Sequence, residues 1–544
     1  MRLLLSWGCG LAAAGSLGVT AAEPVGTHVH PAAVQAGTTG IVSFNGRFDP
    51  WPCEVHASSP GLTFVPQQEA GTFEVSVDPA VPPGPVLLRA FNAEGASAPV
   101  ALVIAHSPQT AEVEPNDDFR SPQILASSIA TLNGRMDKSD DVDCYQMVLA
   151  KGQTLVAWVE AHVLAAGFDA MLQVTDVRGL ILAFNHDGPA TMDPLLVFTA
   201  PEDGPYGVRI MGHKYPAASD IRFAGGKDCV YRLHLSTGAV VRTVWPLAAP
   251  KEGLISAEGW NLPASRMPAG PNTTILFPPP PGGPVELAES AGPSPLTSSC
   301  AVSGRITTPG EEDRYPFHAS KGDPLELTVS GATLGSEIDP VIKVLDAAGK
   351  QLAVNDDAGG STEARLVWTA PEDGRYLAAV GDLTQRGGAA FYYRLALTRP
   401  LPGVRATTAN HSCTIRAGET AVVKVKVVFT NGFPHPLTLT AVNPPAGISA
   451  ATVPVPGKGG EVNLTLTAEA TAPAASQPIQ FQLRSETTGL EFPVIHEMVS
   501  TSENNGVPQG FRRLLIPKTP DLWLTVTVPP EPKKESVSGS APAP

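Results

Sequence analysis

Adjacent carboxylates are the residues of this sequence that come closest to the pattern of general acid and base chemistry. Examples are Asp140-Asp141 and Glu311-Glu312-Asp313. Proton transfer in catalysis requires such groups to line a cleft and to have shifted pKa values. Acidic runs are also typical of turns and solvated surface, and this chain has a net charge of −15 at pH 7. We therefore interpret most of these carboxylates as turn and surface charges.

Two histidines near the start form another candidate for chemistry. His28 and His30 lie two residues apart on an expected strand, so both face the same way. They could share a metal ion, or they could be a solvent-facing pair beside Pro31. The HExxH, GxSxG, P-loop and dinucleotide motifs do not occur. The sequence predicts no catalytic residues and no enzyme.

Composition indicates the elements that position these groups. The 544 residues include 55 prolines and 52 glycines, and only 16% of them are charged. Short runs of Val, Thr and Leu between such turn residues are typical of many short strands. The acidic balance, with no cluster of Lys and Arg, excludes a nucleic-acid-binding surface. We predict an all-β chain of tandem β-sandwich modules that are jelly-roll-like and immunoglobulin-like.

One long segment occurs twice, with equivalent residues 170 positions apart. The pairs are Gly134 and Gly304, Tyr145 and Tyr315, Asp169 and Asp339, Asn185 and Asn355, Phe198 and Trp368, and Tyr206 and Tyr376. A repeat of this length predicts two copies of one domain. Each copy of roughly a hundred residues has room for a sandwich of about eight strands.

The turns inside each copy have recognisable signatures. A four-residue Asp-to-Gly turn, 176–179 and again 346–349, predicts a hairpin between alternating apolar runs. The Asn185-His186-Asp187 and Asn355-Asp356-Asp357 groups are interpreted as turns that shape loops rather than as ligands. A Pro-Glu-Asp-Gly turn follows in both copies, and Tyr206 or Tyr376 is expected to anchor the next strand.

These motifs in this order resemble the bacterial pre-peptidase C-terminal domain. The first copy matches at Glu112 to Asp117, Asp141 to Tyr145, Asn185 to Asp187, and Ala200 to Tyr206. The second copy keeps 313–315, 338–340, 355–357 and 370–374 but lacks the acidic lead. The resemblance implies a β-sandwich of secreted enzymes or exported surface proteins, and its collagenase members bind calcium and collagen.

The resemblance also implies a calcium site in the first copy. The residues that match its ligands are Glu112, Glu114, Asn116, Asp117, Asp140 and Asp143. Calcium takes six to eight oxygen ligands, which a flexible acidic segment can provide. The alternative is that Asn116-Asp117 caps a turn and the carboxylates are solvated. Because the second copy lacks the acidic lead, the expected site is asymmetric.

The segments outside the repeat suggest further sandwiches. Val25 to Phe48 and Val240 to Leu262 resemble the start of an immunoglobulin-like domain of the transcription-factor (TIG) type, and the alternating C-terminal segment resembles another immunoglobulin-like sandwich. The predicted parts are a signal peptide (1–22), a TIG-like sandwich (23–107), a first pre-peptidase-like sandwich (111–237), a shorter TIG-like module (238–297), a second pre-peptidase-like sandwich (298–399), an immunoglobulin-like sandwich (405–528) and a disordered tail (529–544).

The first residues have the pattern of an export signal. Arg2 is followed by an apolar run to Val19, and cleavage is expected near Glu23. No later apolar stretch approaches the roughly 20 residues that a membrane helix requires. The five remaining cysteines are Cys53, Cys144, Cys229, Cys300 and Cys413. An oxidising compartment permits disulfides, with Cys144 and Cys229 the first pair to test, but these residues could equally be small buried hydrophobes.

Together these patterns predict a non-catalytic exported protein, periplasmic, secreted or associated with the cell surface. Its expected partner is an extracellular protein or polysaccharide, with no cofactor other than calcium. The alternative is an accessory protein of a secreted peptidase or other hydrolase. Trp245, Trp260, Trp368 and Trp523 could include an exposed binding aromatic, although Trp368 aligns with Phe198 and is predicted to be core.

Overall fold

The computed structural model describes residues 22–188, 191–247, 256–262, 274–275, 295–296, 299–358, 361–498 and 514–528. Nearly all regular structure in these residues is β-strand, and the two helices are single 3₁₀ turns, His162–Leu164 and Ala332–Leu334. The prediction of an all-β chain is confirmed. The expected signal peptide and the C-terminal tail from Pro529 lie outside the described residues.

The first part, which we call the N-terminal sandwich (22–105), has two sheets. Their strand orders are β1-β3-β6-β5 and β2-β9-β7-β4, with β8 paired to β7. Strand β6 shows why they pack, because its residues alternate between buried and exposed and so present one apolar face to the core. The strands are β1 (Val25–His30), β2 (Ala33–Gln35), β3 (Thr39–Arg47), β4 (Glu54–Ala57), β5 (Leu62–Pro66), β6 (Thr72–Val77), β7 (Gly84–Asn92), β8 (Gly95–Ala96) and β9 (Val100–Ala105).

The first repeat (110–236) is a sandwich of two five-stranded sheets. Their orders are β10-β12-β19-β14-β17 and β11-β13-β18-β15-β16. One apolar cluster, which includes Leu132, Leu155 and Phe168, fills the space between them. The strands are β10 (Thr110–Ala111), β11 (Gln123–Ile124), β12 (Ile129–Arg135), β13 (Asp143–Leu149), β14 (Thr154–Glu160), β15 (Phe168–Thr175), β16 (Ile181–Asn185), β17 (Leu195–Thr199), β18 (Gly204–Lys214) and β19 (Val230–Ser236).

The second repeat (295–398) has the same order without the first two strands. Its sheets are β23-β30-β25-β28 and β24-β29-β26-β27. Trp368 packs against this core, 4.8 Å from the ring of Tyr376, as predicted from its alignment with Phe198. The strands are β23 (Cys300–Arg305), β24 (Glu312–Ala319), β25 (Pro324–Ser330), β26 (Pro340–Leu345), β27 (Gln351–Asn355), β28 (Ala364–Thr369), β29 (Gly374–Asp382) and β30 (Tyr392–Thr398).

The repeated turns form as predicted. The amide of Gly179 donates to the carbonyl of Asp176 at 3.0 Å, and Gly349 does the same to Asp346. Each turn joins a hairpin, β15 to β16 in the first repeat and β26 to β27 in the second. These local bonds explain why the two copies keep an aspartate and a glycine three residues apart.

The predicted tyrosine anchors are also confirmed. The hydroxyl of Tyr206 donates to the carbonyl of Glu202 at 2.9 Å, and that of Tyr376 donates to Glu372 at 2.8 Å. Each tyrosine therefore ties the Pro-Glu-Asp-Gly turn to the strand that follows it. That turn carries the chain from one sheet of the sandwich to the other, since β17 and β18 belong to different sheets.

A short three-stranded sheet, β21-β20-β22, lies between the repeats. It comprises β20 (Val240–Trp245), β21 (Ser256–Trp260) and β22 (Thr274–Ile275). Its β20–β21 pair has a bulge like that of β1 and β3. A Cβ at Gly259 would lie 2.1 Å from the carbonyl oxygen of Val240, and one at Gly46 would lie 1.7 Å from that of Val25. The two segments matched by sequence thus share one bulged hairpin that requires glycine at the same place.

The C-terminal sandwich (403–527) is built from eleven strands in one branched sheet that folds over a single core. Val423, Val425 and Val427, predicted from their alternation, are all buried in that core. The strands are β31 (Gly403–Thr408), β32 (Ser412–Arg416), β33 (Thr420–Thr430), β34 (Thr438–Val442), β35 (Ile448–Ala450), β36 (Val453–Pro454), β37 (Gly460–Ala468), β38 (Ala475–Arg484), β39 (Glu491–Glu497), β40 (Lys518–Thr519) and β41 (Leu522–Thr527).

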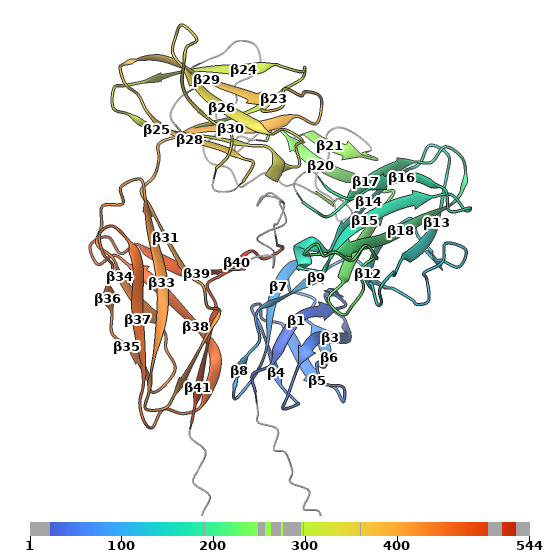
Figure 1. Cartoon of the computed structure of the whole chain (residues 1–544), viewed down its shortest axis with the longest axis horizontal. Helices are drawn as coiled ribbons and strands as arrows, with labels where there is room; N and C mark the ends of the chain where they lie inside the picture. The colour runs from blue at the N-terminus through green and yellow to red at the C-terminus, as the bar shows by residue number, and fades with distance from the viewer. Residues whose placement is uncertain are drawn as a thin grey trace, which may run out of the picture.

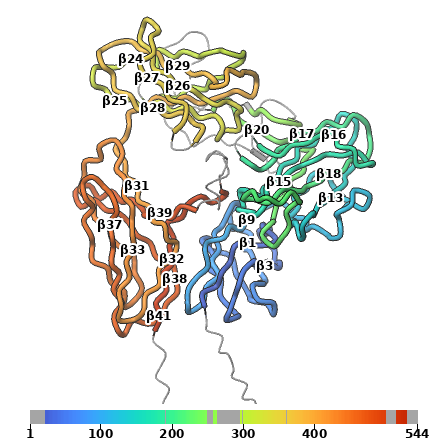
Figure 2. The backbone as a smooth tube through the Cα atoms, in the orientation of Figure 1, coloured from blue at the N-terminus to red at the C-terminus, as the bar shows by residue number. Residues whose placement is uncertain are grey.

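The parts are arranged in a closed loop, so that the N-terminal and C-terminal sandwiches lie side by side (Figures 1 and 2). Strand β8 of the first contacts β41 of the last. His28 is a half-buried residue of another junction, where its imidazole donates to the carbonyl of Ala165 in the first repeat at 2.7 Å. In the described chain, no group of three or more possible metal ligands includes His28 or His30. The sequence suggested either a metal site or a solvent-facing pair, and the contact of His28 with Ala165 fits neither.

The cysteines follow the second of the two alternatives left open by the sequence. Cys53, Cys144 and Cys229 are buried and form no disulfide with one another, and Cys413 is half-buried. Cys144 packs with Val142 and Met211 on one side of its sheet, whereas Cys229 lies in the central core of the first repeat. The proposed Cys144–Cys229 bridge is therefore wrong in this structure, because the two side chains belong to different apolar clusters.

Candidate metal centre

The acidic lead segment of the first repeat crosses from one sheet of the sandwich to the other. Strand β10 pairs in parallel with β12, and β11 pairs in parallel with β13. The segment between them, which begins at Glu112, passes the end where β13 starts at Asp143. Two short strands on different sheets therefore hold this segment against the sandwich.

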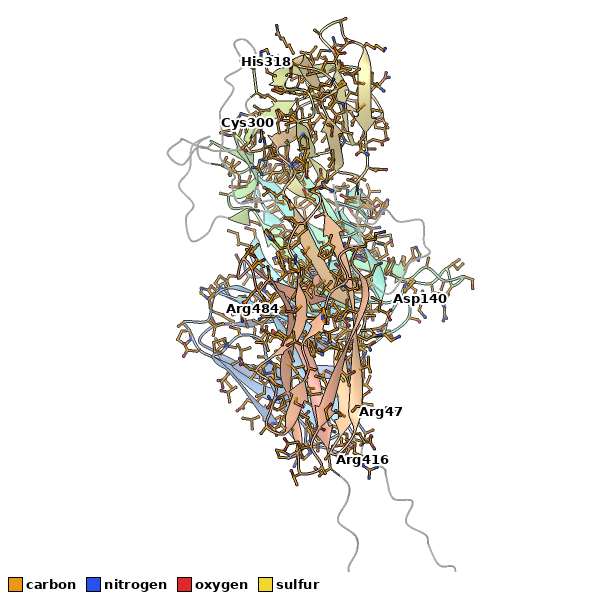
Figure 3. The ribbon with its side chains drawn as sticks, turned by 90° about the vertical axis from the view of Figure 1, so that its left-hand side faces the viewer. Arg47, Asp140, Cys300, His318, Arg416 and Arg484 are labelled. Carbon is orange, nitrogen blue, oxygen red and sulfur yellow. The ribbon has the colours of Figure 1, made fainter. Side chains whose placement is uncertain are left out.

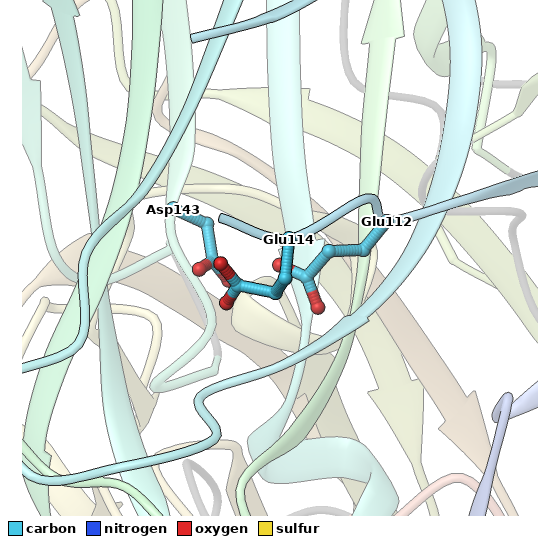
Figure 4. Close-up of side chains that lie close together, drawn as sticks. All are labelled: Glu112, Glu114 and Asp143. Carbon is cyan, nitrogen blue, oxygen red and sulfur yellow. The ribbon is translucent and has the colours of Figure 1, made fainter. Parts of the chain in front are cut away.

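The crossing brings Glu112, Glu114 and Asp143 together (Figure 4). One carboxylate oxygen from each lies within 4.8 Å of the others. Two hydroxyls also reach this group: the Tyr231 oxygen lies 2.5 Å from Asp143 and 3.0 Å from Glu112 and can donate its one proton to either, and the Tyr145 oxygen lies 3.3 Å from Glu112. Tyr145 lies 2.6 Å from the Tyr231 hydroxyl, oxygen to oxygen. The first cluster is thus three carboxylates over a pair of buried phenols.

Glu114 also belongs to a second cluster with Asp117 and Asp141, again within 4.8 Å. Lys138 supplies a cation here, with its ammonium 2.7 Å from Asp117 and 3.8 Å from Asp141. One ammonium group cannot neutralise all the carboxylates of the two clusters.

Several oxygens at the site are buried without a hydrogen-bond partner. They are Oδ1 of Asn116, of Asp141 and of Asp143, three residues whose relative exposure is at most 1%. A buried polar atom without a partner costs roughly 1–3 kcal/mol, and a charged one costs more. These three oxygens lie where the carboxylates converge, and Oδ1 of Asp141 is also 3.8 Å from the Lys138 ammonium.

The pKa values reflect the same imbalance. Burial, with the neighbouring Glu112 carboxylate, raises the pKa of Asp143 to about 11. Burial, with Asp117 close by, raises the pKa of Asp141 to about 7. The phenol of Tyr231 has its pKa raised well above its ordinary value by burial and by these acids. The folded protein therefore holds protons here that a bound cation would displace.

The structure brings together five of the six ligands implied by the family resemblance, Asn116 included. The amide of Asn116 donates to Glu112 at 3.4 Å. Asp140 lies outside these groups, and its place in the ligand set stays a prediction. Its backbone is left-handed, with φ of 65°, and its carboxylate accepts the amide of Phe223 at 3.1 Å, so it shapes a turn at the outer margin of the first repeat (Figure 3).

Asp141 is the ligand candidate that the sequence argument missed. It precedes β13 and lies two residues before Asp143, so both side chains point to the same face of the extended chain. Asp140 lies in the turn before this extended chain, and its carboxylate accepts the amide of Phe223. The period of two that identified the core positions of the other strands was the signal that could have selected Asp141 over Asp140.

The equivalent positions of the second repeat form no such cluster among the described residues. Glu311, equivalent to Asp141, accepts the amides of Thr307 and Thr308 at 2.7 and 2.8 Å. Asp313, equivalent to Asp143, accepts the hydroxyl of Tyr393 at 2.6 Å. Here each acid is satisfied by donors of its own repeat.

Other sequence candidates shape loops, as predicted. The side-chain oxygen of Asn185 accepts the amide of Leu195 at 3.3 Å, and that of Asn355 accepts Arg365 at 3.0 Å. Asp193, a buried acid that the sequence analysis did not single out, also shapes a loop. Its carboxylate accepts the amides of Ala161, His162 and Val163. Glu363, 170 residues after Asp193, accepts backbone amides in the same way in the second repeat. The repeat spacing could therefore have predicted this pair of acids.

The chemistry of the donor set fits calcium. All six side chains, Glu112, Glu114, Asn116, Asp117, Asp141 and Asp143, offer oxygen, the ligand atom that calcium prefers, and no sulfur or imidazole takes part. Carboxylates of this number also favour a divalent cation over a single ammonium group. The donor set is therefore rich in oxygen, in a chain built of β-sandwiches.

Comparison with known proteins gives one partial match to a protease. No protein-family model matches the chain. It is similar to a probable subtilase-type serine protease of Deinococcus radiodurans, with 26% identity over 219 residues. The match covers 39% of this chain and 26% of that protease, so most of the relative has no counterpart here.

Two solved structures show a distant likeness. Tripeptidyl peptidase 2 is 10% identical, with 96% of this chain and 40% of that chain covered at a TM-score of 0.15. A mutant Salmonella alpha-2-macroglobulin is 11% identical, with 86% and 32% covered at a TM-score of 0.14. Scores this low carry no argument about function. Within the described residues, no helix has the length and apolar composition needed to span a membrane.

Proposed function

We propose that this chain is a non-catalytic exported scaffold of tandem β-sandwiches, with calcium bound in the first of two pre-peptidase-like repeats. The observation that most directly supports calcium binding is the set of buried oxygens without a hydrogen-bond partner on Asn116, Asp141 and Asp143. Glu112, Glu114 and Asp117 would complete the ligand set. Calcium would neutralise these carboxylates and hold the acidic lead segment against both sheets.

Two acids with shifted pKa values outside the candidate metal centre support a non-catalytic role. Asp193, whose pKa burial raises to about 7, caps the 3₁₀ turn at His162–Leu164. Glu160 has a pKa of about 2, which the nearby His234 and Arg232 hold down against the opposing effect of burial. Each of these groups has a structural partner, and none is set beside a nucleophile. A substrate-processing carboxylate would instead face a cleft.

Two hollows among the described residues support the same view. A cavity of about 10 Å³ beside Cys144 and Arg209 is too small for a substrate, and burial raises the pKa of that thiol to about 11, which opposes a nucleophilic thiolate. A wider hollow of about 480 Å³ along β33 is lined by residues such as Lys426, Phe429 and Lys458. Neither hollow presents a nucleophile with an activating base.

The edge strands of the repeats support a protein partner rather than a polysaccharide. Strands β16 and β27 end their sheets, so each has an unpaired backbone edge. Leu182 and Phe184 are exposed on β16, and Leu352 and Val354 are exposed at the equivalent positions of β27. An extended apolar peptide could pair with such an edge, whereas a sugar gains little from aliphatic side chains.

An accessory role in a secreted peptidase system is the second candidate. It is favoured by the similarity over 219 residues to a probable subtilase-type protease. Most of that relative lies outside the match, which leaves enough length for a catalytic domain. Both candidates predict that the purified chain from residue 23 hydrolyses no peptide. Robust turnover of a fluorogenic peptide mixture would overturn both.

Calcium is tested separately by isothermal titration calorimetry. We expect one site per chain, abolished in Asp143→Asn, with proton release that rises when buffer pH is lowered towards 6 because Asp141 then holds more of its proton. A chain that binds no calcium at millimolar concentrations would remove the site. That result would remove calcium from the proposal but not the non-catalytic role, which the peptidase assay tests separately.

A further inference from the structure

The junction that closes the loop of modules is built around one buried arginine. Arg89 lies on β7 of the N-terminal sandwich, and only 4% of it is exposed. Its guanidinium donates to Ser97 of its own sandwich at 3.1 Å and to the carbonyl of Asp521 in the C-terminal sandwich at 3.0 Å. These bonds join two parts of the chain that are 432 residues apart.

A third partner of this guanidinium is Nδ1 of His411, at 3.2 Å. Arginine has only donors, so Nδ1 must accept, and an imidazole can accept only when it is neutral. Protonation of His411 at this nitrogen would remove the acceptor and put two positive charges in contact. The bond is therefore compatible with only one protonation state.

Aromatic packing forms the other half of the junction. Trp523 of β41 is 1% exposed, and its ring lies 5.0 Å from Phe91 and 5.6 Å from His56, centroid to centroid. Its indole N–H donates to Ser476 at 2.9 Å. Of the tryptophans that the sequence suggested as exposed binding aromatics, Trp523 is thus buried between two modules.

Positive charge would accumulate in this junction at low pH. The N-terminal sandwich contributes Arg89 and His56, and the C-terminal sandwich contributes His411 and His496, whose rings lie 5.8 Å apart. The acids that face them are Asp521 and Glu497. Asp521 already accepts from Gln480 at 2.6 Å, and Glu497 is paired with Arg405.

We propose that the Arg89–His411 contact is an acid-sensitive latch, which holds the two end sandwiches together while His411 is neutral and releases them when it is protonated. Release would separate Phe91 from Trp523 and expose both. A second contact, from the amide of Leu515 to the carbonyl of Val163 at 2.7 Å, joins the C-terminal segment to the first repeat. Opening would therefore pivot about that point rather than free the modules completely.

The direction of the effect follows from the histidine environment. Burial, with Arg89 and His496 nearby, lowers the pKa of His411 to about 4, and burial also lowers the pKa of His56 and His496. A released imidazole would return towards 6.5. Closure is therefore fully favoured above pH 6.5 and is lost as pH falls towards 4, with up to a tenfold change in the open-to-closed ratio per pH unit and per histidine.

Small-angle X-ray scattering of the full chain between pH 7.5 and 4.5 tests the latch. The wild-type chain should expand reversibly as pH falls, with retained far-UV circular dichroism. His411→Asn keeps an acceptor near the Nδ1 position but cannot be protonated, so it should expand less and at lower pH. His318→Asn, at an exposed position in the second repeat, is the matched control and should behave as wild type.

Arg89→Gln provides a second variant, because it retains an N–H donor without the charge. It should shift the acid expansion to lower pH, even if His411→Asn fails to fold. Constant dimensions of the wild-type chain across this range would overturn the proposal. Expansion of both variants at the wild-type pH would also overturn it, because the transition would then arise elsewhere.

Discussion

The two repeats share a framework but differ in how they treat their acids. In both, a glycine on the first long strand lies under a tyrosine of the last one, Gly134 under Tyr231 and Gly304 under Tyr393. In both, that tyrosine hydroxyl lies within 2.7 Å of a second one, from Tyr145 or Tyr315. The part that both repeats share is thus a glycine packed against one of two paired tyrosines, and it requires no ion.

The difference lies in what is added to that shared part. The first repeat adds β10, β11 and the acidic segment between them, and it leaves buried oxygens without partners. The second repeat keeps only Glu311 and Asp313, and supplies each with donors. The acidic segment can therefore be present or absent at one end of this sandwich without change to the order of its other strands.

Removing calcium should give the largest difference between the two repeats, because only the first is expected to bind it. Calcium at a hundred times its Kd would stabilise the first repeat by about 2.7 kcal/mol. Hydrogen-exchange mass spectrometry of the full chain, which follows each repeat separately, should show slower exchange with calcium in 110–236 and no change in 299–398. Asp143→Asn should lose the response. Equal protection of both repeats would contradict the asymmetry.

Replacing the shared glycines should, in contrast, affect the repeats equally. A Cβ would lie 2.3 Å from the Tyr231 ring at Gly134 and 2.2 Å from the Tyr393 ring at Gly304. Each change to alanine should cost about 2 kcal/mol, because the tyrosine must move. Urea unfolding measures this, with Gly40→Ala as the control, since a Cβ there has no atom within 4 Å. A neutral Gly304→Ala would show that the two repeats differ here.

Exchanging neighbouring aspartates sharpens the assignment within the first repeat. Asp141→Asn should weaken calcium binding at least tenfold, about 1.4 kcal/mol. Asp140→Asn should leave the Kd within about twofold, because Asp140 bonds the amide of Phe223. Titration calorimetry of both variants compares them. A larger loss for Asp140→Asn would restore the spacing implied by the family resemblance.

The smallest expected difference is in pH dependence without calcium. The folded first repeat binds protons more tightly than its unfolded chain, since the pKa of Asp141 is raised from 3.8 to about 7. Its stability should fall as pH rises from 4 through 7. In the second repeat hydrogen bonds lower the pKa of Glu311, so part of its stability is lost in the opposite direction, as pH falls. Exchange protection, corrected for intrinsic rates, should therefore change more steeply in the first repeat, and parallel slopes would contradict this.

The sequence predicted the framework well because local rules govern it. Asp176 to Gly179 forms its hairpin turn through bonds within four residues, and Tyr206 reaches only four residues back. The candidate site was predicted less completely. Glu112 and Asp143 meet because two short strands attach to different sheets, an arrangement that spacing alone does not reveal. Spacing also does not reveal that a left-handed turn directs the side chain of Asp140 towards Phe223.

What the sequence by itself determined is the all-β class, the duplication and the turns, since strand periodicity and turn chemistry act over a few residues. Only the tertiary structure decided which carboxylates converge and that the first and last sandwiches meet. Arg89 and His411 are 322 residues apart, and no local pattern connects them. Their contact depends on the packing of every module between them, which is a property of the whole folded chain.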